Sequence, residues 1–351
     1  MGITPVDVSI ILPVYNAAEW LDECLGSIKR QQDLGEGMTV ELSIFNDSSK
    51  DDSLDILKSW KDMLISFGIH VILSGHSNAE PKGVGYAKNQ AVRQSSGRFL
   101  CFQDADDIMD PMRIKLQYQA ALKHQNTIIG CKVTRIPKDS TIRYTRWCNG
   151  MTQKQLLTQV FTSHGPTVLM PTWFCSRQVY DKVGGFDERG KGIPEDLLFF
   201  HKFLGLGGAV CRIDEYLLTY RYHPECTTHS VHRDTIWDIR ITAIQKNIIN
   251  QWKHFTIWNA GKEGRRFYRS LSTGNRSKVK AFCDVDAKKI GKVYTYEECK
   301  ESPKPKVPIL HFSEASPPFI ICVKLDLTGG GLERNIESLN LVEGEDYFYF
   351  S

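Results

Sequence analysis

Short apolar segments alternate strictly with segments of helical periodicity from residue 8 to residue 107. The apolar segments are rich in β-branched residues and are the expected strands, whereas the segments between them carry apolar side chains at helical spacing. The expected strands are residues 8–12, 39–47, 69–75 and 98–107, and the expected helices are residues 16–32, 53–64 and 84–96. This alternation predicts an α/β fold in which a mainly parallel, Rossmann-like sheet carries helices on both faces.

The alternation loosens beyond residue 130, although further elements remain readable. Residues 132–147 are basic and β-prone, and residues 165–188 read as a strand, a helix and a turn. The remaining expected elements are a helix at residues 195–207, strands at residues 209–214 and 217–223, and a long helix at residues 235–254. We expect this last helix to close a first domain of residues 1–250.

A second, smaller α/β domain is expected at residues 251–351. Its first strand leads into a G-x-G-x-x-G-like motif (residues 259–264) with Asn259 in the first glycine position, and Asp284 or Asp286 ends the next strand. That layout is typical of dinucleotide-binding units. The missing glycine and the small size favour instead a retained Rossmann-like fold that docks the acceptor or a partner.

The cysteines and the hydropathy of the sequence indicate in which cellular compartment the protein is expected. The ten cysteines are scattered singly without a CxxC pair, which disfavours a structural zinc site and fits a reduced environment. No apolar run approaches the roughly 18 residues that span a bilayer, and residues 1–16 lack the features of a secretory signal. We therefore expect a cytoplasmic protein with no membrane partner. The net charge of +3 permits a nucleic-acid or phosphate partner without requiring one.

Polar residues gather at the end of each expected strand. The four clusters are residues 13–16, 46–52, 75–85 and 104–107. Ligands of parallel α/β sheets bind at the carboxyl ends of the strands, so the four clusters are expected to form one site. Their joint placement is stronger evidence than any one of the motifs.

The acidic cluster is a candidate cation site. Asp104 and Asp106 are two residues apart at a strand end, a spacing that places both carboxylates on one side of the chain. Hard divalent cations are held in this way together with substrate phosphates. Asp107 is expected to point elsewhere and to cap the helix that follows. The triplet alone is also consistent with ordinary caps and surface turns.

The first two clusters are candidate nucleotide contacts. Asp47 can accept a hydrogen bond from the imide N–H of a pyrimidine base. The segment from Pro13 to Asn16 offers backbone groups and the aromatic face of Tyr15 near the same edge, and Asn16 is also a candidate helix cap.

The third cluster combines glycines with a cation. Gly83 and Gly85 permit close backbone approach to a phosphate, and Lys88 and Asn89 lie in the helix that begins there. Simple turn geometry and a solvated helical lysine are the alternative interpretations of these residues.

Two later segments carry further candidates. Glu195 and Asp196 begin an apolar helix, where a carboxylate can stay ionised and accept a proton, although acidic pairs at helix starts are common. Arg221, His223 and His229 follow a strand, and a histidine here can complete a metal shell or contact a diphosphate.

These segments resemble, in order and spacing, the family-2 nucleotide-sugar glycosyltransferases with the A-type fold. The resemblance spans residues 8–230 and rests on the motifs at residues 8–28, 45–57, 83–107, 184–188 and 194–200. It implies a nucleoside-diphosphate-sugar donor, Mn²⁺ or Mg²⁺ at the D-x-D, and inversion at the anomeric carbon. It also implies that Asp47 meets uracil, Asp104 lies near the ribose and the metal, Asp106 binds the metal, Asp196 is the general base, and His223 approaches the metal or the diphosphate.

Two positions depart from the family pattern. Asn46-Asp47-Ser48-Ser49 stands where D-D-G-S is usual, which bears on the finer nucleotide contacts. Lys88 stands where arginine is usual and keeps a cation there.

Four further segments, at residues 165–177, 255–271, 280–286 and 319–330, extend the resemblance to almost the whole chain, second domain included. With them the chain resembles the queuosine-tRNA galactosyltransferases. This resemblance implies transfer of galactose from UDP-galactose to the cyclopentene-diol of queuosine at the wobble position of tRNA for tyrosine. Residues 132–147 would then supply phosphate and stacking contacts to RNA. The alternatives are a transferase of UDP-N-acetylglucosamine or another UDP-sugar to a glycan or protein, and a non-catalytic RNA-binding scaffold.

Overall fold

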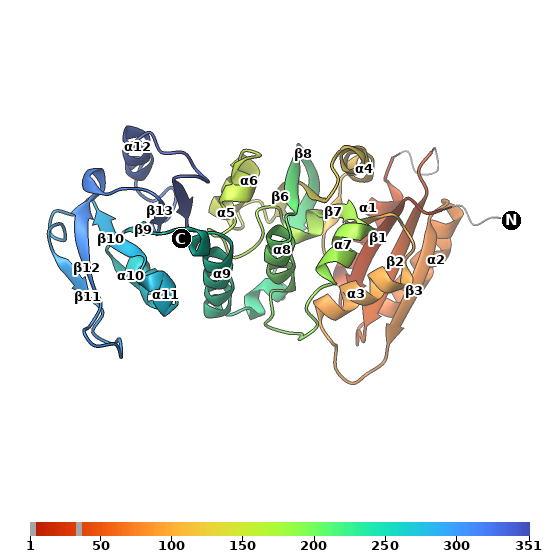
Figure 1. The fold of residues 1–351 in the computed structure, drawn as a ribbon. Helices are drawn as coiled ribbons and strands as arrows, with labels where there is room; N and C mark the ends of the chain where they lie inside the picture. Colours follow the sequence, from red (N-terminus) through yellow and green to blue (C-terminus); the bar gives the residue numbers. More distant parts are fainter. Residues whose placement is uncertain (1–4, 33–36) are drawn as a thin grey trace. The chain divides into compact units, whose positions relative to one another are not determined.

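The computed structural model describes residues 5–32 and 37–351 and divides into two compact units (Figure 1). The first four residues, part of the N-terminal segment discussed above, lie outside this range. Unit 1 comprises Met1–Leu156 and Gly165–His232, and unit 2 comprises Leu157–His164 and Arg233–Ser351. The division therefore falls before residue 250, and the long helix that was expected to close the first domain belongs to unit 2.

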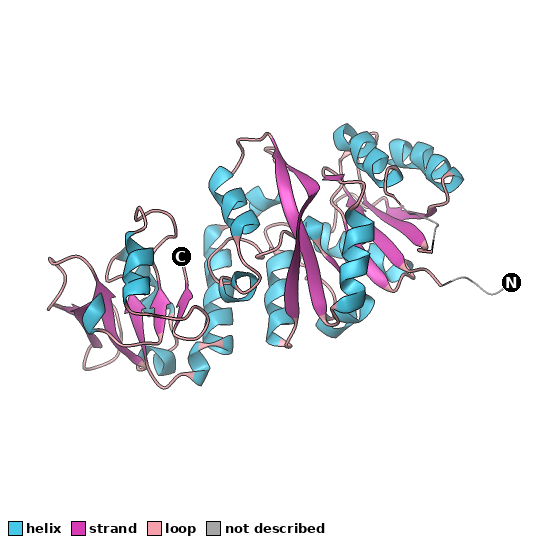
Figure 2. Cartoon of the chain, turned by 90° about the horizontal axis from the view of Figure 1, so that it is seen from above, coloured by secondary structure: helices cyan, strands magenta, loops and turns pink. Residues whose placement is uncertain are grey.

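The N-terminal half of unit 1 has the predicted alternation. Strands β1 (Val8–Val14), β2 (Val40–Asp47), β3 (His70–His76) and β4 (Phe99–Phe102) form a parallel array in the order β3-β2-β1-β4. Helices α1 (Ala18–Lys29), α2 (Ser53–Ser66) and α3 (Val84–Gln94) connect them. β1 and β2 are buried along their whole length, as expected for a sheet covered on both faces (Figure 2). β4 ends at Phe102, so the acidic cluster follows the strand.

The rest of the eight-stranded sheet is mixed, in the order β4-β7-β6-β8-β5. β6 (Thr127–Ile136) and β8 (Ala209–Arg221) are parallel, whereas β7 (Phe174–Ser176) and β5 (Ile108–Met109) run antiparallel to their neighbours. The helical elements are α4 (Arg113–Lys123), α5 (Ile142–Gly150), α6 (Gln155–Thr158), η1 (Met170–Thr172), α7 (Arg177–Val183), α8 (Glu195–Gly205) and η2 (Thr227–Ser230). The two strands expected between residues 209 and 223 are one strand, β8, because both parts pair with β6 across a register irregularity.

The basic segment at residues 132–147 was expected to be β-prone throughout, and this is wrong for its second half. β6 ends at Ile136, which pairs with Arg221, the last residue of β8. β8 therefore offers no partner beyond that point, and Pro137 lacks the N–H that a ladder needs. The segment folds instead as helix α5, in which Cys148 is buried.

Unit 2 is a second α/β layer structure. Its sheet has the order β11-β12-β10-β9-β13-β14, and all of its strands except β11 are parallel. The elements are α9 (Arg233–Asn247), η3 (Ile249–Gln251), β9 (Phe255–Trp258), α10 (Lys262–Ser270), α11 (Thr273–Arg276), β10 (Val279–Asp284), β11 (Val293–Thr295), β12 (Lys306–His311), η4 (Phe312–Glu314), β13 (Phe319–Ile321), α12 (Gly331–Ser338) and β14 (Tyr347–Tyr349). In chain order the parallel strands run third, second, first, fourth, fifth, which is the Rossmann arrangement predicted for this unit.

The glycine-motif loop of unit 2 is occupied by its own side chains. Asn259 Oδ1 accepts the Gly261 N–H at 2.7 Å, and its Nδ2 donates to the Cys322 carbonyl at 2.7 Å. Asp284 Oδ2 accepts from the Ala260 N–H at 2.9 Å and from Lys289 Nζ at 3.0 Å. In dinucleotide-binding units, amides of this loop hold the pyrophosphate and the acid at the strand end holds the ribose. Here the amides of Ala260 and Gly261 and the carboxylate of Asp284 already have hydrogen-bond partners within the chain. This favours the docking interpretation of unit 2.

Candidate active site

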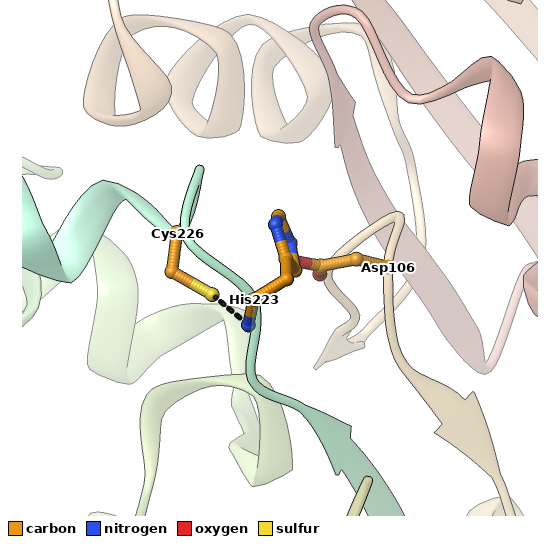
Figure 3. A group of neighbouring side chains, drawn as sticks. All are labelled: Asp106, His223 and Cys226. Atoms are coloured by element: carbon orange, nitrogen blue, oxygen red, sulfur yellow. Dashed lines mark hydrogen bonds and ion pairs between the residues drawn. The ribbon is translucent and has the colours of Figure 1, made fainter. Parts of the chain in front are cut away.

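Three carboxylates gather in the loop after β4. One oxygen each of Asp104, Asp106 and Asp107 lies within 4.8 Å of the others. Asp106 Oδ2 also lies 3.0 Å from His223 Nε2, beyond the end of β8 (Figure 3). The cluster thus joins the acidic loop to the β8 end, as the sequence predicted for Asp104, Asp106 and His223.

Asp107 differs from its prediction, because it caps no helix. The helix that follows begins after Met112, whose N–H is taken by Asp110. Asp107 Oδ1 accepts the Arg221 N–H at 2.8 Å, while its Oδ2 is buried with no hydrogen-bond partner among the described residues. A buried carboxylate oxygen without a donor is costly unless a cation meets it. The donor set of carboxylate oxygens and one imidazole therefore fits a divalent cation.

The electrostatics of the cluster agree with a need for positive charge. Burial raises the pKa of Asp104 to about 6 against the lowering effect of Lys88, and the charges of Asp106 and Glu195 add to the rise. Burial, followed by the charges of Asp106 and Asp104, raises the pKa of Asp107 well above its usual range. Like charges at this separation oppose joint ionisation, which a bound cation relieves.

Lys88 of α3 lies buried between two acidic groups. Its Nζ is 2.9 Å from Glu195 Oε1 and 3.9 Å from Asp104 Oδ1. Burial alone would lower the pKa of Lys88, but the carboxylates of Glu195 and Asp104 raise it above its ordinary value. Lys88 is therefore neither the solvated lysine of the alternative interpretation nor a free donor to phosphate. It ties the acidic loop to the start of α8.

Asp196 follows Glu195 at the start of α8. Its Oδ1 accepts the Leu197 N–H at 2.7 Å. Burial and then the Glu195 charge raise the pKa of Asp196 to about 7, with a smaller contribution from Asp104. A half-buried carboxyl whose pKa lies near neutrality is suited to accept a proton.

Asp47 anchors the neighbouring loop. It ends β2, and its Oδ1 accepts from His76 Nε2 at 2.7 Å and from the Lys82 N–H at 3.0 Å. Its Oδ2 accepts the Gly83 N–H at 2.7 Å. A carboxylate has about four lone-pair sites, so one remains for a ligand donor.

The two glycines of the α3 loop have a packing role. Gly83 has a φ of +102°, and a Cβ added there would lie 2.8 Å from the Cα of Gly190. A Cβ on Gly85 would lie 2.1 Å from the carbonyl oxygen of Asp187. The space that glycine leaves is thus filled by the loop before α8, whereas the sequence suggested a phosphate there.

The end of β1 supplies the remaining predicted residues. Pro13 is buried within β1, and Tyr15 is 46% exposed just beyond it. Asn16 is not the helix cap, because α1 is preceded by Ala17. Asn16 instead donates its N–H to Ser49 Oγ at 2.9 Å and has a φ of +47°, so it holds the polar loops after β1 and β2 together.

Several site residues escaped prediction from the sequence. They are His76, which orients Asp47; Asp107, which adds an oxygen to the acidic cluster; and Cys226, whose sulfur lies within 4.8 Å of ligand atoms of Asp106 and His223. The signal for Cys226 in the sequence is the H-P-E-C run at residues 223–226, which places a cysteine three residues after a candidate metal-binding histidine.

Comparison with known proteins identifies the family of the chain. Residues 9–184, half of the 351-residue chain, match the family described as "Glycosyl transferase family 2". The chain belongs to glycosyl transferase family 2. The glycosyltransferase assignment and its A-type fold, predicted from the motifs, are thereby confirmed.

Relatives of this glycosyltransferase are distant. It is 27% identical over 231 residues to an uncharacterized glycosyltransferase of Rickettsia typhi, a match covering 64% of this chain and 66% of that protein. It is 22% identical to the uncharacterized glycosyltransferase EpsJ of Bacillus subtilis, covering 74% of each. Among solved structures, TarS of S. aureus in complex with UDP-GlcNAc matches with a TM-score of 0.51 at 19% identity, covering 76% of this chain and 70% of that one. That likeness shows the fold.

None of the helices described for this glycosyltransferase combines the length and the hydropathy that crossing a bilayer requires.

Proposed function

We propose that this glycosyltransferase moves a sugar from a nucleoside-diphosphate donor to an acceptor hydroxyl with inversion at the anomeric carbon. The observation that carries the proposal is the buried Lys88, which brings the acidic cluster and the Glu195–Asp196 pair into one site. The carboxylates proposed to bind the cation and the helix that carries the candidate base are thus linked through one lysine. The UDP-GlcNAc complex of TarS supports a UDP-sugar as the donor class.

Asp196 is the base in this proposal. It accepts the acceptor's hydroxyl proton as the hydroxyl oxygen attacks C1 of the sugar from the face opposite the nucleotide, through an oxocarbenium-like state. Its pKa of about 7 leaves it ionised in much of the enzyme at neutral pH and still basic enough to bind the proton. Glu195 is engaged differently, since its Oε1 accepts from Lys88 Nζ at 2.9 Å.

Asp104, Asp106 and His223 would hold Mn²⁺ or Mg²⁺, with Asp107 adding an oxygen. Such a cation supplies charge neutralisation at the departing diphosphate. Asp47 would accept from the uracil imide with its remaining lone pair, and Pro13, Tyr15 and Asn16 line the same edge. Gly83 contributes to the donor site indirectly, through the loop that Asp47 fixes.

For the finer assignment we propose galactose from UDP-galactose as the donor and queuosine at the wobble position of tRNA-Tyr as the acceptor. This rests on the long sequence resemblance. A basic pocket of about 380 Å³ at α5 supports an anionic acceptor. Its lining residues are Lys138, Ile142, Thr145, Arg146, Asn149, Gly150 and Tyr216. We propose that unit 2 docks the acceptor, and that the protein works in the cytoplasm.

The deciding experiment measures UDP release from UDP-galactose and UDP-N-acetylglucosamine, with and without Mn²⁺. The acceptors are purified tRNA with queuosine and the same tRNA without it. Mn²⁺-dependent release from UDP-galactose only with queuosine tRNA, and a hexose added to the nucleoside by mass analysis, support the full proposal. Release with a glycan or protein acceptor supports the first alternative. Binding of tRNA without release from any donor supports the scaffold.

A further inference from the structure

A short turn after β8 brings a thiol beside the acidic cluster. In the segment from His223 to Cys226, the Cys226 N–H donates to the His223 carbonyl at 3.1 Å. The His223 N–H donates back to Cys226 Sγ at 3.3 Å. The turn therefore holds the sulfur against the backbone of His223, whose imidazole meets Asp106 from the other loop (Figure 3).

The three side chains form a mixed ligand set. One sulfur, one ring nitrogen and one carboxylate oxygen, from Cys226, His223 and Asp106, all lie within 4.8 Å of one another. Tetrahedral zinc sites use these three donor types, with ligand bonds of about 2.0 to 2.3 Å, so small rotations of side chains would close the set around one ion. A thiolate selects zinc-like ions over magnesium and manganese, which prefer oxygen.

We propose that Asp106, His223 and Cys226 form a binding site for a thiophilic divalent cation of the Zn²⁺ class. On binding, the Cys226 thiol loses its proton to solvent and its sulfur coordinates the ion, and the His223–Asp106 contact is exchanged for two metal bonds. Burial raises the pKa of Cys226 to about 11 against the lowering effect of the His223 N–H that points at the sulfur, so the bound ion itself supplies the charge that stabilises the thiolate.

This site overlaps the site proposed for Mn²⁺ or Mg²⁺ and excludes it. The group of Asp104, Asp106 and Asp107 supplies that hard cation mainly with carboxylate oxygens. Asp106 and His223 belong to both sites, so a zinc-class ion removes two ligands from the cation that assists transfer. We therefore infer that zinc-class ions inhibit the enzyme by competition at Asp106 and His223. This inhibitory consequence rests on the proposed function, whereas the binding site does not.

Binding is tested with Co²⁺, which reports a sulfur ligand by a thiolate-to-metal charge-transfer absorption. The full-length protein should show this band on titration with Co²⁺ and lose it when Zn²⁺ is added. Cys226→Ser should abolish the band and weaken Zn²⁺ binding, measured by calorimetry, by at least about tenfold. Cys211→Ser is the matched control, because Cys211 is a half-buried free thiol of β8 that belongs to neither ligand group. It should keep both the band and the affinity.

Two outcomes overturn the site: a wild-type protein without the charge-transfer band, or a band that survives in Cys226→Ser. The wild-type spectrum decides even if the variant does not fold. Inhibition is measured separately, as the Zn²⁺ concentration that halves Mn²⁺-supported UDP release relative to each variant's own zinc-free rate. That concentration should rise at least about tenfold in Cys226→Ser. A clear band in a protein without transfer activity would refute the proposed function and leave the zinc site standing.

Discussion

Lys88 Nζ and Glu195 Oε1 form a buried ion pair at 2.9 Å, across 107 residues of sequence. The two residues are 2% and 7% exposed, so neither charge is compensated by water. Because Lys88 also lies 3.9 Å from Asp104, the pair fixes the start of α8 against the acidic loop. The position of the candidate base, Asp196, thus depends on the residue that departs from the family's usual arginine.

Breaking this pair should destabilise the protein strongly. Lys88→Met leaves the Glu195 carboxylate buried without a partner, which costs about 3–5 kcal/mol of unfolding free energy. The control is Arg93→Met, which breaks a pair of similar length, 2.9 Å to Glu188, whose side chains are 56% and 37% exposed. That change should cost less than about 1 kcal/mol. Denaturant unfolding of both variants measures the difference. Equal losses of unfolding free energy would show that burial does not increase the contribution of the Lys88–Glu195 pair to stability.

Removing the candidate base should stop turnover and spare donor binding. Asp196→Asn keeps the size of the side chain and the acceptor for the Leu197 N–H, but cannot take up a proton. We expect kcat to fall by about a hundred- to ten-thousand-fold, with the Kd for UDP within about threefold of wild type. Asp55→Asn, on the exposed face of α2, is the control and should leave both unchanged. Near-normal turnover of Asp196→Asn would remove Asp196 from the mechanism.

The pH dependence of the rate should report the same group. The base must be ionised to act, and burial together with Glu195 raises the pKa of Asp196 to about 7, with Lys88 opposing and Asp104 adding to the rise. Below pH 7 the ionised fraction falls about tenfold per pH unit, so kcat/KM should rise with pH and level off above about 7. The measurement is kcat/KM from pH 5 to 9 at saturating Mn²⁺. A profile flat down to pH 5 would contradict the assignment.

Donor binding should depend on the cation through Asp106. In the wild type, Mn²⁺ should tighten UDP binding at least about tenfold, and Asp106→Ala should lose this enhancement. Asp110→Asn is a control in the same acidic segment, since Asp110 serves the start of α4 by accepting the Met112 N–H at 2.9 Å, which asparagine also does. Calorimetry of UDP binding with and without Mn²⁺ compares the three proteins. Equal enhancement in Asp106→Ala would place the cation elsewhere.

Much of the fold was predictable because it is encoded locally. The strand and helix periodicities of the sequence predict four strands and three helices up to Phe102. Because the carboxyl ends of parallel strands meet at one edge of a sheet, the same elements predict that Asp104 and Asp47 lie at that edge. The local sequence pattern predicted the wrong element where pairing with a distant strand decides the structure. Residues 142–150 became α5 because β8 ends opposite Ile136.

The contacts within the site were not predictable in the same way. That Lys88 pairs with Glu195, and that Gly83 meets Gly190, follows from the packing of loops far apart in sequence, which no local periodicity encodes. The position of Asp107 before a helix predicts that it caps that helix. Asp110 lies closer to the helix, and its side chain accepts the Met112 N–H instead. Single-residue orientation is thus the part of the site that only the tertiary structure supplies.

The basic pocket at α5 provides the last prediction. If the acceptor is RNA, Lys138 and Arg146 contact phosphates and Tyr216, which is 56% exposed, offers a stacking face. Lys138→Glu combined with Arg146→Glu should weaken tRNA binding at least about tenfold and lower the slope of log affinity against log salt by about 0.7 to 0.9 per lost phosphate contact.

Lys123→Glu, an exposed charge reversal in the last turn of α4, is the control for that double variant and should leave the salt slope within error of wild type. Fluorescence anisotropy of labelled tRNA at several salt concentrations measures both quantities. The kcat with a saturating short queuosine-containing anticodon stem-loop should change little, because the pocket residues lie outside the carboxylate cluster. An unaltered slope in the double variant would show that RNA binds elsewhere, and unit 2, with its Rossmann-like sheet, would then be the surface to vary next.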